Sequence, residues 1–390
     1  MNITIVMDGR FEWANGTAYS SHMAYHPFVE RFLRVFDTAT ICARAYDVPL
    51  PTGAPVSGPR ADFLRLGNYR GAKLFVRQLP NLLAALWRLA GSRDPVLAYL
   101  PGTLPIIFGF MRLVRGRRLF SLVVADPADQ LQRGALQHPL RRFARSAFIW
   151  SLRFLLRRSS GAMYVTKKYL QERYPAPRGK QFATSDVFIG EQDITTARPA
   201  SAFEHSPKIL TYVAMMAQDY KGHDDLIHAF KIACTSGANI RLKLVGDGPL
   251  RAKIEAMADG AGIRSFVEFK GKVAHGQDMI DELDASDLFV MTSRAEGLPR
   301  AMVEAMARGM PVISTNVGGV PELIPKECIV APNDKEAFAK KIIEVIDDAE
   351  RLSCLSAQNI EIARYYTSKK VDQRIQNFYR FIRQESQSVR

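Results

Sequence analysis

The sequence predicts an α/β protein with two doubly wound, Rossmann-like domains that face a cleft. Its 390 residues exceed what one ordinary hydrophobic core holds, so two domains are expected. Short β-branched runs alternate with longer amphipathic patterns from end to end, which is typical of parallel sheets covered by helices on both faces. The polar, proline-punctuated segment Glu191–Pro207 is the best linker between the two domains.

The predicted strands are short, apolar and separated by helical patterns. In the first half they are Ile3–Met7, Val96–Leu100, Arg118–Ala125 and Ala162–Thr166. In the second half they are Ile209–Ala214, Arg241–Val245, Val267–Lys270, Leu288–Thr292 and Pro311–Thr315. Amphipathic stretches such as Leu226–Ala233 and Ala301–Arg308 predict helices that cover the sheets.

The net charge of +14 lies entirely in the first half of the chain. Residues 1–200 hold 28 Lys and Arg against 13 Asp and Glu, whereas residues 201–390 hold 25 against 26. This asymmetry predicts an anionic partner for the first half, which leaves nucleic acid, a membrane surface and an acidic substrate open.

The cysteines indicate a reducing compartment, because Cys42, Cys234, Cys328 and Cys354 form neither a Cys-x-x-Cys pair nor a Cys/His cluster. The start of the chain lacks the pattern of a signal peptide. The longest uncharged stretch, Pro95–Met111, is too short to span a bilayer and contains several Pro and Gly residues. We therefore expect a cytoplasmic protein without a transmembrane helix.

Polar turns follow the predicted strands of the second half, where parallel sheets bind their ligands. The first such turn holds Lys221-Gly222, the second is Gly246–Pro249, and the third is Gly271-Lys272-Val273. Each also fits an ordinary turn: Lys221 a solvated lysine, Gly246–Pro249 simple turn chemistry, and Gly271–Val273 a strand-end turn.

The fourth turn places Glu296 just before a helix and Glu304 about one turn inside it. Pro299 suits the first helical turn, since it lacks an N–H group. Free amides at that helix start favour a phosphate, and the two carboxylates can accept hydrogen bonds from sugar hydroxyls. Alone, the pair also fits two ordinary carboxylates at a helix start.

Taken together, these motifs resemble the E-x7-E signature of glycosyltransferase family 4 over residues 209–325. The residues that carry the resemblance are Lys221-Gly222, Val245–Leu250, Phe269–Gly271, Glu296–Pro299, Glu304–Ala307, Gly309–Val312 and Gly318-Gly319 with Glu322. The resemblance implies the GT-B fold and a retaining, metal-independent enzyme that uses a nucleotide-sugar donor and no cofactor.

The resemblance also implies roles for individual residues. Glu304 is expected to bind the ribose hydroxyls, and Glu296 to face the donor sugar. Lys221 would neutralise the diphosphate as the sugar–phosphate bond breaks. The remaining predicted donor contacts are Gly297, Leu298 and Pro299 near the sugar and diphosphate, and Gly271, Lys272 and Val273 around the base.

Three positions depart from the family pattern. Met216 stands where the family commonly has a diphosphate-binding arginine, so either Arg294 or Arg300 substitutes or the donor is held less tightly. Asp126 stands where many members place a histidine; it either orients the acceptor and takes up its proton or caps a helix. The glycine pair after the first strand is absent, and Gly9 and Asn15-Gly16-Thr17 predict a flexible loop leading into a helix, with Gly16 near the donor.

The segment Gln130–Gln171 has nine cations and no carboxylate. The predicted membrane contacts are a helical stripe of Arg141, Arg145, Arg153 and Arg157 and a cluster of Arg112, Arg115, Arg117 and Arg118. By itself the stripe equally fits a core-facing helix with a solvated arginine face. The resemblance favours an anionic membrane surface, because many such enzymes extend glycans on lipid-diphosphate carriers.

We therefore expect a glycosyltransferase, peripheral on the inner face of the cell membrane, that extends a lipid-linked glycan in exopolysaccharide, capsule or lipopolysaccharide assembly. Residues 1–198 would bind acceptor and membrane, and 199–366 the nucleotide sugar. Residues 367–390 would form a helix, centred on Lys369–Arg383, that packs back on the first domain. The alternatives are a catalytically silent GT-B nucleotide-binding scaffold and, supported only by the charge, a nucleic-acid-binding protein.

Overall fold

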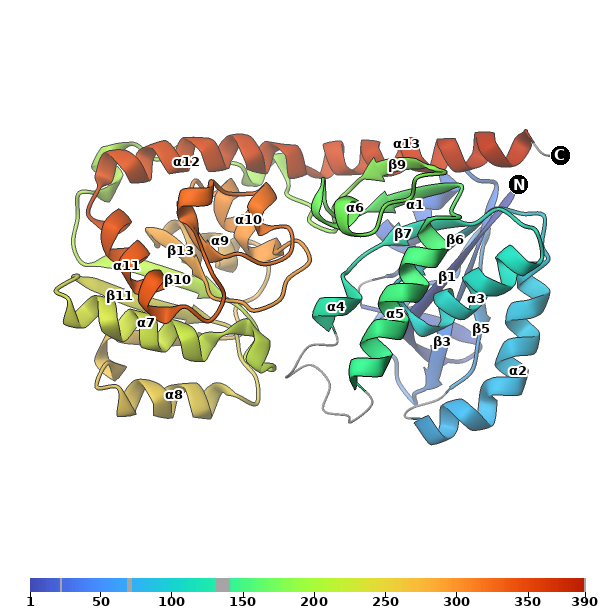
Figure 1. Ribbon diagram of the computed structural model, residues 1–390, viewed down its shortest axis with the longest axis horizontal. Helices are drawn as coiled ribbons and strands as arrows, with labels where there is room; N and C mark the ends of the chain where they lie inside the picture. The colour runs from blue at the N-terminus through green and yellow to red at the C-terminus, as the bar shows by residue number, and fades with distance from the viewer. Residues whose placement is uncertain (22, 69–71, 131–140, 389–390) are drawn as a thin grey trace. The chain divides into compact units, whose positions relative to one another are not determined.

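The computed structural model describes residues 1–21, 23–68, 72–130 and 141–388, and it divides into two compact units (Figure 1). Unit 1 comprises Met1–Pro127, Phe143–Thr184 and Asp372–Arg390. Unit 2 comprises Ala128–Arg142 and Ser185–Val371. Each unit is built on its own sheet of mainly parallel strands, so the predicted α/β fold class is confirmed.

The sheet of unit 1 runs in the order β5-β3-β1-β6-β7-β8-β9, and neighbours along this path are parallel. Two short strands, β2 and β4, add an antiparallel flap beside the end of β1. The strands are β1 (Asn2–Ala14), β2 (Thr17–Ser20), β3 (Thr38–Asp47), β4 (Ala54–Pro55), β5 (Ala61–Arg65), β6 (Val96–Leu100), β7 (Phe120–Val123), β8 (Gly161–Tyr164) and β9 (Lys180–Ala183).

The first strand corrects one prediction from the sequence. Gly9 lies inside β1, and Asn15 and Gly16 form the left-handed turn of the β1–β2 hairpin. The predicted flexible loop leading into a helix is therefore wrong. A hairpin forms because β1 continues past its pairing with β6, which ends at Val6↔Ala98, and pairs with β2 from Glu12↔Tyr19 to Ala14↔Thr17.

Helices connect the parallel strands of unit 1, and the C-terminal helix packs against the same unit. Figure 1 shows α13 running above α1 and β9. Asp372 on α13 accepts from Arg34 at 2.6 Å, and Gln376 donates to the carbonyl of Arg31 at 2.9 Å. The helices are α1 (Glu30–Leu33), preceded by a π-turn at Tyr25–Val29, α2 (Ala72–Ala90), α3 (Thr103–Val114), α5 (Arg141–Leu156), α6 (Tyr169–Arg173) and α13 (Ser368–Gln387). The short helix α4 (Pro127–Gln130) begins at the last residue before the chain passes into unit 2.

The sheet of unit 2 runs in the order β12-β11-β10-β13-β14-β15, and all its pairs are parallel. Its strands are β10 (Lys208–Val213), β11 (Ile240–Val245), β12 (Val267–Gly271), β13 (Leu288–Met291), β14 (Val312–Thr315) and β15 (Ile329–Val330). Its helices are α7 (His223–Thr235), α8 (Arg251–Gly260), α9 (Gln277–Asp284), α10 (Arg300–Ala307), α11 (Lys335–Ile346) and α12 (Ala349–Ala363). The chain reverses direction across the sheet between β10 and β13, which makes that point the switch point of the unit.

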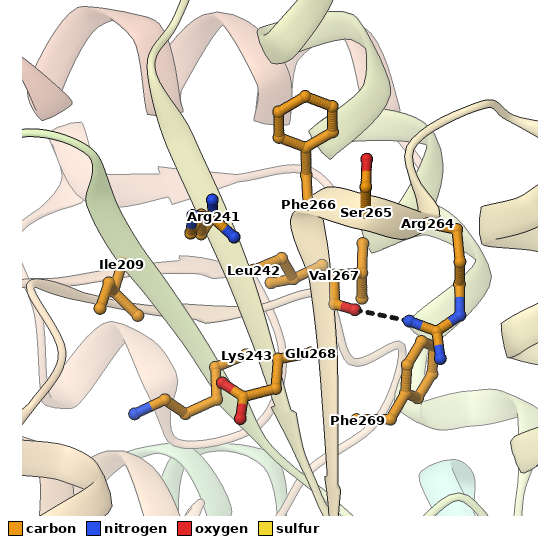
Figure 2. Close-up of a pocket in the computed structure, with 10 residues that line it drawn as sticks. All are labelled: Ile209, Arg241, Leu242, Lys243, Arg264, Ser265, Phe266, Val267, Glu268 and Phe269. Atoms are coloured by element: carbon orange, nitrogen blue, oxygen red, sulfur yellow. Dashed lines mark hydrogen bonds between the residues drawn. The ribbon is translucent and has the colours of Figure 1, made fainter.

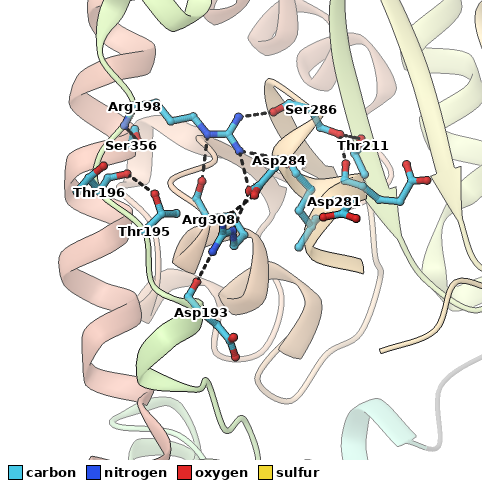
Figure 3. Close-up of polar contacts among 12 residues, drawn as sticks. Asp193, Thr195, Thr196, Arg198, Thr211, Asp281, Asp284, Ser286, Arg308 and Ser356 are labelled. Atoms are coloured by element: carbon cyan, nitrogen blue, oxygen red, sulfur yellow. Dashed lines mark hydrogen bonds and ion pairs between the residues drawn. The ribbon is translucent and has the colours of Figure 1, made fainter. Parts of the chain in front are cut away.

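The predicted linker Glu191–Pro207 is packed onto unit 2. Figure 3 shows its anchor, Arg198, whose backbone N–H donates to Ser356 Oγ at 2.8 Å and whose Nε donates to the carbonyl of Arg308 at 3.0 Å. Arg308 in turn binds both carboxylate oxygens of Asp284, at 2.6 and 2.7 Å, and the carbonyl of Asp193 at 2.8 Å. The chain passes between the units at Pro127–Ala128, Arg142–Phe143, Thr184–Ser185 and Val371–Asp372, whereas the sequence placed the boundaries at 198/199 and 366/367.

Arg112 is buried in unit 1, with 2% of its surface exposed. Its guanidinium donates to the carbonyls of Arg118, Ser92 and Asp94 at 2.7 to 2.9 Å and to that of Ala90 at 3.4 Å. Burial lowers its pKa to about 10, so it stays charged at neutral pH. The prediction that Arg112 contacts a membrane is therefore wrong, because its charge satisfies backbone acceptors.

Arg112→Leu should destabilise the protein by about 3 kcal/mol, since it leaves buried carbonyls without donors. Arg115→Leu, three residues on at an exposed position, is the matched control and should change stability by less than about 1 kcal/mol. Urea unfolding followed by circular dichroism measures both, and equal losses would contradict a special role for Arg112.

Candidate functional site

The switch point of unit 2 brings together two loops that follow β10 and β13. The backbone N–H of Arg294 donates to the carbonyl of Tyr220 at 2.7 Å, and Thr292 Oγ1 donates to the carbonyl of Gly222 at 2.7 Å. Gly222 has a φ of 68°, and a Cβ there would overlap the carbonyl of Thr292. Only glycine allows this approach, so Lys221 is held directly beside the loop that carries Glu296.

Lys221 and Glu296 form the ion pair at the centre of this site. Lys221 Nζ lies 2.8 Å from Glu296 Oε1, and the side chains are 22% and 11% exposed. Ser293 Oγ donates to the same oxygen at 2.6 Å, and the Tyr212 hydroxyl contacts Ser293 Oγ at 2.8 Å while donating to the carbonyl of Lys221. The structure therefore joins two predicted site residues and adds two hydroxyl residues that the sequence did not single out.

The loop Glu296–Pro299 is supported by the loop after β14. The backbone N–H of Gly319 donates to the carbonyl of Gly297 at 2.7 Å. Gly318 has a φ of 50°, and a Cβ there would overlap the carbonyl of Glu296. Leu298 is buried, and Pro299 caps α10 as the residue before the helix, where the sequence expected it inside the first turn.

Glu304 lines a cavity of about 250 Å³ between α9, α10 and the segment that enters unit 2. Its lining combines apolar side chains with a few charged ones, which is the usual character of a small-molecule site. The lining residues are Phe188, Ile189, Asp193, His275, Gly276, Met279, Ile280, Leu283, Arg300, Glu304, Ala307 and Arg308. Phe188 and Asp193 were missed from the sequence, because their segment reads as a spacer and carries no motif.

The predicted substitutes for the diphosphate arginine differ in their surroundings. Arg294 binds Asp224 and Asp225 at 2.8 and 2.6 Å, Asn333 at 2.8 Å and the carbonyl of Asp219 at 2.8 Å. Arg300 is exposed and lines the Glu304 cavity. Arg294 thus stabilises the turn that carries Lys221 through its bond to the carbonyl of Asp219. Binding of a diphosphate by either arginine stays a prediction.

Met216 is fully buried in the core of unit 2. Its backbone pairs with the second strand-end turn, since its N–H donates to the carbonyl of Asp247 and its carbonyl accepts from Leu250. The backbone N–H of Gly246 donates to the carbonyl of Gly271 at 2.8 Å. Lys272 is exposed and Val273 is half-buried. The turn Gly246–Pro249 therefore supports the neighbouring loops, and base binding by Gly271–Val273 stays a prediction.

Asp126 lies in unit 1, directly before α4, and its side chain is 1% exposed. Arg173 Nε lies 2.6 Å from Oδ2, Tyr169 donates to Oδ2 at 3.1 Å, and Tyr174 donates to Oδ1. Burial raises the pKa of Tyr174, which keeps that hydroxyl a donor. The structure gives Asp126 a bonding role inside unit 1, and contact with an acceptor stays a prediction.

The remaining predicted membrane residues lie on α5 and on the turn after α3. Arg145, Arg153 and Arg157 are exposed, and so is Arg115, which lies over the Trp87 ring at 5.0 Å. Arg117 is half-buried, and Arg118 is paired with Glu385 at 2.8 Å. The side chain of Arg141 lies outside the described residues.

A second hollow, larger than the Glu304 cavity, is shown in Figure 2. It lies toward the amino ends of the unit 2 strands, away from the loops that carry Lys221 and Glu296. It has a volume of about 490 Å³ and is lined by the first residues of β10, β11 and β12, including Ile209, Arg241 and Val267. Ligands of doubly wound sheets bind at the carboxyl ends of the strands. We therefore place the candidate site at Lys221, Glu296 and Glu304.

Comparison with known proteins shows that part of the chain is similar to one family. Residues 193–361 match the family described as "Glycosyl transferases group 1". The match spans less than half of the chain and lies within unit 2. The chain is also 26% identical to protein CapJ of Staphylococcus aureus over 97% of this chain and 98% of CapJ.

Solved glycosyltransferase structures share the whole fold. Anabaena Alr3699/HepE in complex with UDP-glucose has a TM-score of 0.62 and 16% identity, over 97% of this chain and 99% of that chain. The lipopolysaccharide outer core galactosyltransferase WaaB has a TM-score of 0.66 and 13% identity, over 98% of this chain and 100% of that chain. The predicted GT-B fold is therefore confirmed.

The stability of the protein should depend on the protonation of His223, the first residue of α7. His223 is buried beside the Tyr212 ring, and burial lowers its pKa from 6.5 to about 4. The folded protein therefore favours neutral His223, so its contribution is complete above pH 6.5 and is lost as the pH falls toward 4, at about 1.4 kcal/mol per unit.

His223→Gln, which keeps a side-chain donor, should remove this part of the pH dependence. Urea unfolding gives the free energy of unfolding of both proteins at pH 7.5 and at pH 5. Between these two pH values the wild type should lose about 2 kcal/mol more of this free energy than the variant does. Parallel curves for the two proteins would show that His223 does not titrate as expected.

Proposed function

We propose that the protein is a group 1 glycosyltransferase that moves a sugar from a nucleotide-diphosphate sugar to a lipid-linked glycan, with retention at the anomeric carbon and without a metal. The observation that carries the proposal is the Lys221–Glu296 pair at the switch point, next to the helix that presents Glu304 to a cavity. The similarity to HepE, solved with UDP-glucose, supports the donor class. The similarity to WaaB supports a role in surface glycan assembly.

In this mechanism each site residue has one task. Glu304 accepts hydrogen bonds from the ribose, and Glu296 accepts them from the donor sugar. Lys221 stabilises the negative charge that grows on the diphosphate as the sugar–phosphate bond breaks. The acceptor attacks from the face that the diphosphate leaves, and the departing phosphate takes up the acceptor's proton, so no residue forms a covalent bond to the sugar.

In this mechanism Lys221 must bind the diphosphate while it is already paired with Glu296. A lysine ammonium has three donors, so Lys221 can bind a phosphate oxygen while it keeps one bond to Glu296. The carboxylate then stays oriented by Ser293 when the donor arrives. The pair thus sets the position of both groups before binding, which lowers the cost of ordering them in the transition state.

Glu304→Ala should weaken the binding of UDP or GDP at least ten-fold, because it removes charge-assisted hydrogen bonds worth about 1.5–3 kcal/mol. Glu336→Ala, an exposed carboxylate at the start of α11, is the control and should bind as the wild type does. Calorimetric titration measures affinity, and a panel of UDP- and GDP-sugars with a lipid-linked acceptor measures nucleotide release.

Absence of turnover with the whole panel, together with unchanged nucleotide binding in Glu304→Ala, would refute the proposal. Nucleotide binding that depends on Glu304 but gives no turnover with any donor would identify a catalytically silent scaffold. Full activity in EDTA is expected, and so is a product with the anomeric configuration of the donor.

We further propose that the protein works on the inner face of the cell membrane, bound through α5. Phe143 and Trp150 on this helix are 75% and 60% exposed, and the Trp150 ring stacks on Phe110 and Phe154. Exposed arginines flank them, and the segment has no carboxylate. Exposed aromatics among cations are typical of helices that lie on anionic membranes. No helix of the described residues is long and apolar enough to cross a membrane.

Arg153→Ala/Arg157→Ala should reduce flotation with vesicles that contain phosphatidylserine by roughly thirty-fold in the partition constant, at about 1 kcal/mol per cation. The control, Lys326→Ala/Lys340→Ala, removes the same charge from exposed positions of unit 2 and should float as the wild type does. Equal recovery of the wild type with neutral and anionic vesicles at low salt would overturn electrostatic binding.

A further inference from the structure

A groove of about 540 Å³ lies between β9 and α13 in unit 1. Figure 1 shows these two elements side by side. The groove is lined by Lys180, Gln181, Phe182, Ala183, Arg374, Asn377, Arg380, Phe381 and Gln384. This set has three cations, three amides, two phenyl rings and no carboxylate, and no motif of the sequence pointed to it.

The cations give the groove a positive potential that its own residues do not neutralise. Lys180 and Arg380 are exposed, and the ion pairs found among the described residues include neither of them. Arg380 donates to Asn377 Oδ1 at 3.2 Å, and Lys180 Nζ lies 5.3 Å from the Phe182 ring. An arginine fork and a lysine ammonium above one surface suit carboxylate, sulfate or phosphate groups.

The aromatic residues provide a fixed apolar surface below these cations. The Phe182 ring lies 5.1 Å from Phe378 and 5.3 Å from Phe381, and Phe381 packs edge-on against Phe120 at 6.3 Å. Both groove rings are half-buried, so each keeps part of its surface toward the groove. The C–H face of a sugar ring can cover such a surface and remove it from water.

The amides decide which class of anion fits. Gln181, Asn377 and Gln384 are exposed and offer both donors and acceptors, which match hydroxyl groups that also donate and accept. A ligand that has only acidic groups would leave the amide acceptors unused. We propose that the groove between β9 and α13 binds an acidic oligosaccharide, with its acidic groups on Lys180 and Arg380 and its hydroxyls on the amides.

This proposal goes beyond sugar transfer, since the donor residues belong to unit 2 and the groove to unit 1. The site would hold a charged glycan chain without reacting with it. Because its residues take no part in donor binding, glycan binding and nucleotide binding can be measured and lost separately.

The test compares a heparin-derived hexasaccharide with neutral maltohexaose by calorimetric titration of the full chain at 0.15 M salt. The wild type should bind the heparin fragment at least ten-fold more tightly. Lys180→Ala/Arg380→Ala should weaken that binding at least ten-fold, whereas the equally charged control Lys326→Ala/Lys340→Ala should change it less than two-fold. Equal weakening in both variants would overturn the proposal.

A second variant tests recognition of the hydroxyls. Asn377→Ala/Gln384→Ala leaves the charge unchanged and should weaken binding of the heparin fragment several-fold. A hexaglutamate peptide should bind to the wild type more weakly than the heparin fragment does. No effect of this variant, or equal affinity for the peptide, would mean that the groove responds to charge alone and would overturn the proposal. The affinity of these variants for UDP, measured by the same titration, should equal that of the wild type. If the wild type binds neither UDP nor GDP, the proposed function is refuted, whereas the proposed glycan site is not.

Discussion

The ion pair between Lys221 and Glu296 is the contact on which the candidate site depends. It joins the loops after β10 and β13, the two strands on either side of the switch point of unit 2. A largely buried carboxylate without a partner would be costly, so each loop stabilises the charge that the other carries. The site is thus built by pairing two loops far apart in sequence, with Ser293 and Tyr212 fixing the orientation of the pair.

The close approach of these loops explains why the surrounding residues are small. At Gly222 and Gly318 a Cβ would overlap a carbonyl of the loop that carries Glu296, so these positions accept no side chain without moving the site. The backbone bond from Gly319 to Gly297 then holds the start of α10. The backbones that carry Lys221 and Glu296 are therefore positioned by direct contacts between the loops.

The sequence predicted the strands best where burial on both faces requires an unbroken run of apolar residues. Val96–Leu100 was predicted with the bounds of β6, because a strand covered on both faces must be apolar throughout. The hairpin at Gly16 was missed, since β2 and β4 are short and are set by pairing alone, β2 with β1 and β4 with β2. Arg112 was misassigned because its partners are backbone carbonyls, which leave no trace in a sequence.

The structure also divides the basic charge of the first half among different tasks. Arg112 binds carbonyls and Arg118 binds Glu385, so neither contributes a free cation to the surface. Among the residues of the first half that stay exposed, the arginines of α5 lie with exposed aromatic rings, whereas Lys180 lies with amides and with Arg380, which α13 supplies from the second half. A lipid surface offers acyl chains below its anionic groups, and a glycan offers hydroxyls around them. In the two proposals, basic side chains serve two surfaces whose neutral residues differ, and those neutral residues would distinguish the partners.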